Sequence, residues 1–287
     1  MSVYVHTAHV IAPHRLTMKG ASSGLAEPDY SRHIDIRQMR RMSKLIKMGV
    51  YSSMSTIEGY TGELDGIIVA TGLGSISDTY TFMKNMIDRA ESMLAPTAFI
   101  QSTHNTLAGT LGILLANHSY NITWSQRYLS LHFALQDAML QLDTTDHRQI
   151  LLTAADEVTD EVRNIIDQME CLPEGIDWSE GAVSFLISNQ RRSDRDWKLI
   201  RQELIPNHFV ADTIGPDWSD VFNCNNFLKL ESLSPEHDLT MDIGHYFLTD
   251  AIGLGHLLSY PDVEKRDRFI SLGGDEEHTS LLEFQRV

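Results

Sequence analysis

The sequence predicts an α/β fold, because strand-like runs and helical stretches alternate along most of the chain. The first run, Val3 to Ile11, is β-branched and aromatic enough for a buried strand. A second apolar run, Gly66 to Ala70, ends in glycines and leads into a helical stretch from Ser77 to Met93. Because this order of strand, turn and helix recurs, we expect an α/β sheet.

One predicted helix lies between these two strands and carries most of the basic charge of its region. Apolar residues recur at helical spacing from Ile36 to Val50. The opposite side is filled by five basic residues, namely Arg37, Arg40, Arg41, Lys44 and Lys47. This pattern is typical of a solvated helix face, and it also fits a docking surface for an acidic partner.

The rest of the chain continues the alternation. We expect further helices at Asn105 to Leu115, Tyr128 to Leu142, Thr159 to Met169 and Gly244 to Leu258. We expect further strands at Tyr120 to Ser125, Gln149 to Ala155, Gly181 to Ser188, Asn226 to Leu230, Arg268 to Gly274 and His278 to Phe284.

One segment is harder to assign from its sequence. Trp197 to Ile205 fits either a hairpin partner of the preceding strand or a short helix. The segment from Gln190 to Asp220 is the least regular, and we predict that it connects an N-terminal half, residues 1–190, to a C-terminal half, residues 191–287.

Composition narrows the classes of partner. The 287 residues contain 23 Lys and Arg against 39 Asp and Glu, which gives a formal charge of −16. Such a chain repels phosphate backbones, so we expect a protein or small-molecule partner and no nucleic acid. Two cysteines cannot form a disulfide framework, which favours a reducing cytoplasm. The apolar runs are too short to span a bilayer, and the N-terminal segment lacks the basic start of a signal peptide.

Cofactor and metal motifs are incomplete. Gly72-Leu-Gly74 follows a strand, but Ser77 stands where the third glycine of a dinucleotide motif belongs. The thirteen histidines form no H-E-x-x-H pattern, so we expect neither a cofactor nor a metal site. Neither Cys171 nor Cys224 lies in the sequence context of a known nucleophile.

The order of motifs resembles the β-ketoacyl synthase family, the condensing enzymes of the thiolase fold. Residues 121–138 align without gaps on the family's strand and nucleophile helix, N-L-x-x-x-T-A-C-A-x-G-x-x-A-I-x-D-A. Ala154 to Glu157 matches G-G-A-E, and Glu180 opens a match to E-G-A. The early glycine turn after Thr71, the G-H-x-x-x-A-A-G-like helix start at Gly244 and the closing glycines after Ser271 also match. The resemblance implies a layered α/β/α/β/α fold with a shortened C-terminal half.

Departures from the family's catalytic pattern imply that this chain does not condense acyl groups by itself. Tyr128 occupies the position of the acyl-carrying cysteine, and a phenol, which ionises near pH 10, is a poor acyl carrier at neutral pH. The chain has no His-Gly-Thr, and Thr240 replaces the family's lysine. His245 is the catalytic candidate that the resemblance retains. At a helix start its imidazole would stay neutral and donate to a thioester carbonyl.

The resemblance therefore implies a subunit similar to the chain-length factors of aryl-polyene, flexirubin-type and aromatic polyketide pathways. Such a subunit pairs with an active synthase through the strand around Tyr120 to Ser125 and shapes the tunnel that measures the growing chain. One alternative is a working 3-oxoacyl synthase or malonyl decarboxylase with an unconventional site. The other is a homodimer that binds acyl chains or an acyl carrier protein, with the stripe from Arg37 to Lys47 as its docking surface.

Overall fold

The computed structural model describes residues 2–13, 25–92, 96–144, 148–168, 179–214, 221–224, 249–259, 267–275 and 277–287. Its strands are β1 (Val3–Ile11), β2 (Gly66–Ala70), β3 (Tyr120–Trp124), β4 (Gln149–Asp156), β5 (Gly181–Ser188), β6 (Trp197–Pro206), β7 (Val221–Asn223), β8 (Arg268–Gly274) and β9 (His278–Arg286). Its α-helices are α2 (Ile36–Met39), α3 (Lys44–Thr56), α4 (Ile76–Asp88), α5 (Pro96–Gln101), α6 (Thr106–Leu114), α7 (Ser130–Asp143), α8 (Asp160–Gln168), α9 (Val210–Ile214) and α11 (Thr249–Ser259). Three 3₁₀ turns complete the list, at η1 (Tyr30–Arg32), η2 (Arg127–Leu129) and η3 (Asn207–Phe209).

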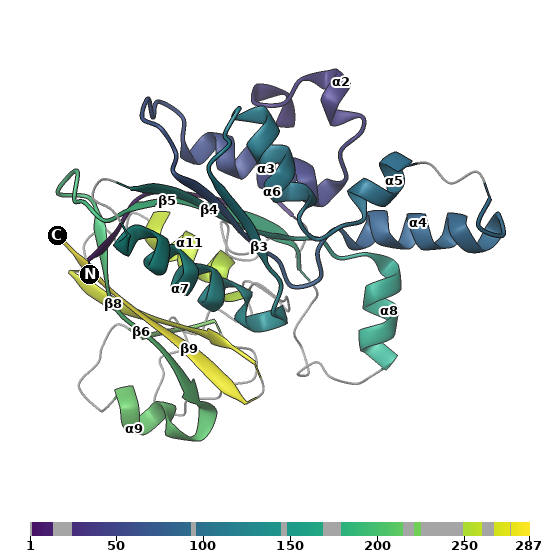
Figure 1. The fold of residues 1–287 in the computed structure, drawn as a ribbon. Coiled ribbons are helices and arrows are strands. Elements are labelled where there is room, and N and C mark those ends of the chain that lie inside the picture. Colours follow the sequence, from purple (N-terminus) through teal and green to yellow (C-terminus); the bar gives the residue numbers. More distant parts are fainter. Residues whose placement is uncertain are drawn as a thin grey trace.

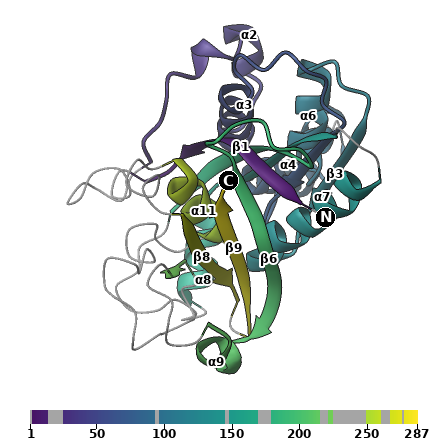
Figure 2. The same ribbon diagram turned by 90° about the vertical axis from the view of Figure 1, so that its left-hand side faces the viewer.

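The described strands form one sheet in the order β3-β2-β4-β5-β1-β6-β9-β8-β7. β2 pairs in parallel with both β3 and β4, whereas β5 runs antiparallel to β4 and β1. β1 pairs with β6 only over Val3 to Val5, so the two halves of the sheet separate beyond this point. Figures 1 and 2 show α7 and α11 lying between these halves.

Alternation along the strands explains the layers. On β2, Ile68 and Ala70 face the core around α7 and α11, whereas Ile67 and Val69 face the core under α3 and α6. On the other half-sheet, Ile270 of β8 packs against the side of α9. The order is thus α3 and α6, half-sheet, α7 and α11, half-sheet, α9, as the predicted α/β/α/β/α layering requires (Figure 1).

Most predicted elements are confirmed, but the helix expected from Ile36 to Val50 is two helices. α2 ends at Met39, and α3 begins at Lys44 after Ser43, a residue type favoured at helix starts. The buried carboxylate of Glu157 accepts a hydrogen bond from the backbone N–H of Leu45, which holds the start of α3 there. Ile36, expected on an apolar face, is 61% exposed.

The segment from Gln190 to Asp220 also differs from its prediction. It contains β6, a ten-residue strand, so it is not an irregular connection. β6 pairs with β1 and β9, and β1 lies between it and β5, which rules out the hairpin with the preceding strand. The division into halves 1–190 and 191–287 stays a prediction, and the strand expected at Asn226 to Leu230 lies outside the described residues.

Candidate functional site

The turn between β3 and α7 holds Tyr128, the residue that the sequence alignment places at the family's nucleophile position. Ser130 is fully buried, and its hydroxyl donates to the Thr71 carbonyl at 2.9 Å and accepts the Gln126 N–H at 2.8 Å. Arg127 has a φ of 50°, a left-handed backbone that is uncommon for a residue other than glycine. The chain therefore has a tight, pinned elbow, and the partly buried Tyr128 lies in the η2 turn that leads into α7.

One turn further along the chain, His132 is buried beside this elbow, as expected for a histidine in an apolar helix. The Nδ1 atom of His132 lies 2.9 Å from the hydroxyl of Ser280 on β9, and Gln202 of β6 donates to the His132 carbonyl at 2.7 Å. Burial lowers the pKa of His132, so its imidazole is neutral at pH 7. His132 thus ties α7 to the second half-sheet. Residues four positions apart on a helix lie on the same face, so the spacing of His132 from Tyr128 is the sequence feature that could have predicted their proximity.

The other catalytic candidates lie elsewhere or outside the described residues. Cys224 follows β7, is 1% exposed, and donates its backbone N–H to the Leu272 carbonyl at 2.7 Å. His245 and Cys171 fall in segments that the structure does not describe. Within the described residues, no group of three His, Cys, Asp or Glu side chains is placed to hold a metal ion.

Two neighbouring carboxylates at the end of β4 organise the loops around the elbow. Asp156 accepts hydrogen bonds from the Thr71 hydroxyl at 2.6 Å and from the Gly72 N–H at 2.7 Å. Glu157 accepts from the Leu45 N–H at 3.2 Å and from the Ser77 N–H at 3.0 Å. Burial raises the pKa of both groups, to about 7 for Asp156. These carboxylates fix the glycine turn after β2 and the starts of α3 and α4.

The predicted basic stripe does not form one surface. Arg37, Arg40 and Arg41 are exposed. Lys44 instead pairs with Glu180 and, at 3.1 Å, with Glu27. The Lys47 ammonium lies 5.8 Å from the centre of the Tyr30 ring. The two lysines therefore do not lie on a solvated helix face. Of the five basic residues, only the three arginines remain exposed for contact with an acidic partner.

Two of the exposed arginines, Arg40 and Arg41, border an open hollow of about 560 Å³ next to the start of α4. Its lining residues are Arg40, Arg41, Met42, Ser43, Asp78 and Gln101. Gln101 donates from Nε2 to the Arg41 carbonyl at 2.6 Å, which links the arginine segment to α5. The hollow presents two guanidinium groups beside one carboxylate, a setting suited to an anionic group.

Within the described sheet, β3 pairs on one side only, with β2. Its inner position is fixed by Asp137 of α7, which accepts from the Tyr120 hydroxyl at 3.0 Å and from the Trp124 indole at 3.1 Å. Burial and the Asp137 carboxylate raise the pKa of Tyr120, which keeps its hydroxyl a donor. On the flanking helices, Ile113 is 83% and Leu140 is 65% exposed. The edge strand is thus tied to α7, and the helices that pack against it carry uncovered apolar side chains.

No helix among the described residues combines the length and hydropathy needed to cross a bilayer. No curated protein sequence matches the chain significantly. Many solved structures match, and three of them do so over 99–100% of both chains. They are a ketosynthase in complex with its chain length factor from Xenorhabdus doucetiae (14% identity, TM-score 0.62), the ishigamide ketosynthase/chain length factor (12%, 0.77), and a type II PKS acyl-carrier protein in complex with its ketosynthase bound to the hexaketide (13%, 0.78).

At these identities the structures show a common fold, which is the thiolase-like α/β fold expected from the motif order. The family model described as the N-terminal domain of β-ketoacyl synthases matches residues 16–200, well over half of the sequence. That match contains the elbow, Tyr128, the paired carboxylates and the edge strand β3. The chain belongs to the β-ketoacyl synthase family.

Proposed function

We propose that the chain is a non-condensing, chain-length-factor-type subunit that pairs with an active β-ketoacyl synthase. The observation that carries this proposal is the elbow, a turn pinned by Ser130 in which the sequence alignment puts Tyr128 in place of the acyl-carrying cysteine. A thiolate attacks a thioester at neutral pH, whereas a protonated phenol does not. The scaffold therefore retains packing and interface roles while the nucleophile is missing.

The edge strand β3 is the proposed contact with the synthase. A strand edge leaves backbone N–H and C=O groups that must be paired or covered. β3 is held at fixed register by Asp137, and Ile113 and Leu140 stand uncovered beside it. Apolar side chains grouped in this way mark an interaction surface rather than a solvated one.

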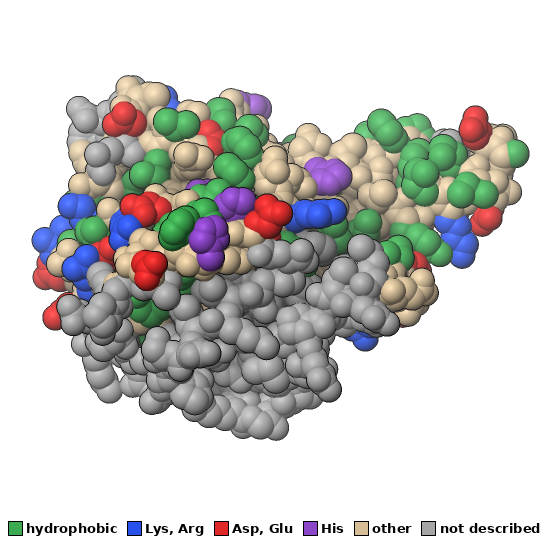
Figure 3. Space-filling model, turned by 90° about the horizontal axis from the view of Figure 1, so that it is seen from below, with side chains coloured by type: hydrophobic (Ala, Val, Ile, Leu, Met, Phe, Trp, Pro, Cys, Tyr) green, Lys and Arg blue, Asp and Glu red, His purple; other side chains and the backbone are tan. Residues whose placement is uncertain are grey.

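The α4 and α5 helices supply a second apolar area. These helices form an arm that projects from the body of the molecule (Figure 1), and green hydrophobic side chains gather on it at the right of Figure 3. Its large exposed apolar side chains are Tyr80, Met83, Ile87, Phe99 and Ile100. Two of the solved structures above are named as ketosynthases with a chain length factor. A partner synthase would cover this arm and share with it the walls of an acyl tunnel.

The decisive experiment co-expresses the chain with a condensing synthase and measures complex mass and product length. The double variant Ile113→Glu, Leu140→Glu places charge beside β3 at exposed positions, so it should fold normally and lose the complex. Ile200→Glu, on a 41% exposed residue of β6, is the matched control and should keep the complex. A complex that tolerates the double variant would contradict β3 as the interface.

An acyl carrier protein is the proposed second partner, at Arg37, Arg40 and Arg41. One of the solved structures is named as an acyl-carrier protein in complex with its ketosynthase. Carrier proteins are acidic, and a surface of formal charge −16 repels them except where arginines cluster. Arg40→Glu should weaken carrier binding at least tenfold, whereas Arg195→Glu, the same charge change on an exposed loop, should not. Equal affinities would exclude this docking surface.

A further inference from the structure

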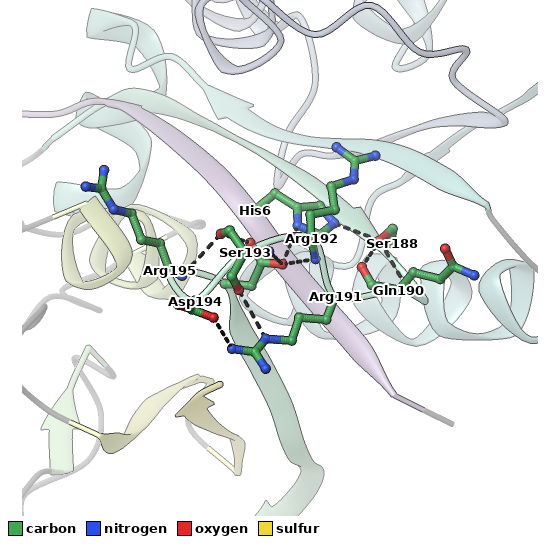
Figure 4. Close-up of polar contacts among 9 residues, drawn as sticks. His6, Ser188, Gln190, Arg191, Arg192, Ser193, Asp194 and Arg195 are labelled. Carbon is green, nitrogen blue, oxygen red and sulfur yellow. Dashed lines mark hydrogen bonds and ion pairs between the residues drawn. The ribbon is translucent and has the colours of Figure 1, made fainter.

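A buried Ser-His-Asp arrangement lies where the two half-sheets separate. His6 falls at the register shift between Val5 and Thr7 of β1, so it occupies a β-bulge. Its Nε2 atom lies 2.7 Å from the Ser188 hydroxyl at the end of β5, and its Nδ1 atom lies 3.0 Å from the Asp196 carboxylate. Figure 4 shows His6 and Ser188 together with the labelled residues of the loop that joins β5 to β6.

The same residues hold the β5–β6 loop. The Asp196 carboxylate accepts from the backbone N–H groups of Arg192, at 2.6 Å, and Ser193, at 3.1 Å, and from the Ser193 hydroxyl. The Ser188 oxygen lies 2.8 Å from the Gln190 carbonyl and accepts the Gln190 N–H at 3.1 Å. The His6 ring therefore bridges the two anchors of one loop, with Ser188 fixing its start and Asp196 its end.

A proton count shows that these contacts cannot all form around a neutral ring. Two contacts are hydrogen bonds that each need one proton, His6 with Ser188 and Ser188 with the Gln190 carbonyl. The third, between Nδ1 and the Asp196 carboxylate, is a close ion-pair contact, and it is attractive only when Nδ1 carries a proton. The carbonyl and the carboxylate are acceptors only. Ser188 supplies one proton and a neutral imidazole supplies one, whereas an imidazolium supplies two. Neutral His6 thus leaves one contact unmade, and protonated His6 completes all three.

The charges around the ring decide which contact is lost. Burial favours the neutral acid at Asp196, but bonds from Arg192, His6 and Ser193 outweigh it and hold the pKa of Asp196 below its usual range. Burial lowers the pKa of His6, and Arg192 adds to this, while Asp196 opposes it. At pH 7 a neutral ring therefore faces a carboxylate, which requires a proton on Nδ1. Nε2 must then accept the Ser188 hydroxyl, and the Gln190 carbonyl loses its donor.

We propose that Ser188, His6 and Asp196 form a proton-operated latch on the β5–β6 loop. With neutral His6, the Ser188 hydroxyl points to Nε2 and the start of the loop is released. With protonated His6, Nε2 donates to Ser188, and the hydroxyl turns to the Gln190 carbonyl and closes the loop. Ser188 is completely buried, so the arrangement is a latch and not a hydrolytic triad.

Nitrogen-15 NMR of the full chain with labelled histidine tests the latch directly. The neutral His6 ring should carry its proton on Nδ1, and the wild-type protein suffices for this measurement. Amide hydrogen exchange of Gln190, Arg192 and Ser193, corrected for intrinsic rates between pH 5 and 8, should slow about fivefold as His6 becomes protonated, the effect of one hydrogen bond.

Ser188→Ala provides the matched variant. It keeps the contact between His6 and Asp196, so the ring should still titrate, but the pH dependence of loop exchange should vanish. Asp194→Asn, on the same loop but outside the latch, should behave as wild type. A neutral ring protonated on Nε2, or loop exchange that follows pH equally in Ser188→Ala, would overturn the proposal.

Discussion

Glu157→Gln is expected to lower the free energy of unfolding by about 2 kcal/mol, because one buried carboxylate serves two helix starts. Glu157 is 5% exposed and accepts from the Leu45 N–H in the first turn of α3 and from the Ser77 N–H and hydroxyl in the first turn of α4. The positive ends of both helix dipoles also favour a negative charge at this point.

The magnitude follows from the three bonds and the burial. A hydrogen bond to a charged group contributes about 1.5–3 kcal/mol against about 1 kcal/mol for a neutral one, so weakening three bonds removes roughly 3 kcal/mol. Burial raises the pKa of Glu157, which means that its charged form carries a desolvation cost. Removing the charge recovers part of that cost, on the order of 1 kcal/mol, and leaves the net loss of about 2 kcal/mol.

Equilibrium urea unfolding of the full chain measures this loss, and Glu58→Gln is the matched control. Glu58 pairs with Arg32 at 2.7 Å, but both side chains are more than half exposed. An exposed pair of this kind contributes at most about 1 kcal/mol. If Glu157→Gln destabilises the chain no more than Glu58→Gln does, Glu157 does not stabilise the starts of α3 and α4 as proposed.

Three further predictions concern titration, packing and the elbow. Burial raises the pKa of Asp156 to about 7, so the stability it contributes is present in acid and lost as pH rises. The difference in unfolding free energy between wild type and Asp156→Asn should shrink by about 2–4 kcal/mol from pH 4 to 8, and a difference that does not change with pH would contradict this. A Cβ on Gly255 would lie 2.3 Å from Val183, whereas one on Gly109 meets nothing within 4 Å. In urea unfolding, Gly255→Ala should destabilise by about 1–3 kcal/mol and Gly109→Ala should stabilise by about 0.5–1 kcal/mol, and equal signs would refute the packing argument. Tyr128→Phe should leave the product profile of the synthase complex unchanged in mass spectrometry, because the phenol hydroxyl takes no part in the chemistry. Loss of the products in this variant would show that the hydroxyl is required.

The strands and most helices follow from the sequence because their signals are local. β2, β5 and β8 are apolar runs bounded by glycines or polar turns, and buried strands of this kind need no long-range information. The break between α2 and α3 is different, because the residue that sets it, Glu157, lies more than a hundred positions away. β6 was ambiguous for the same reason, since its partners β1 and β9 come from the two ends of the chain.

The candidate site also contains residues that local sequence could locate and residues that it could not. The elbow and Tyr128 could be located from a gapless alignment with a family pattern. The loss of Lys44 and Lys47 from the basic stripe could not, because their partners Glu27, Glu180 and Tyr30 come from other segments. The His6 latch gave no sequence signal either, since a bulge in β1 and the loop between β5 and β6 bring its three residues together.

The most direct test of a non-condensing partner subunit is a malonyl-carrier condensation assay on the purified chain, on an active synthase, and on their co-expressed complex. Masses from size exclusion are recorded for each sample. We expect the chain to be inactive alone, to form a stoichiometric complex with the synthase, and to change the length of the product. A homodimer that turns over malonyl carrier by itself would rule out a non-condensing subunit and direct attention to Tyr128, His245 and the two cysteines as unconventional catalysts.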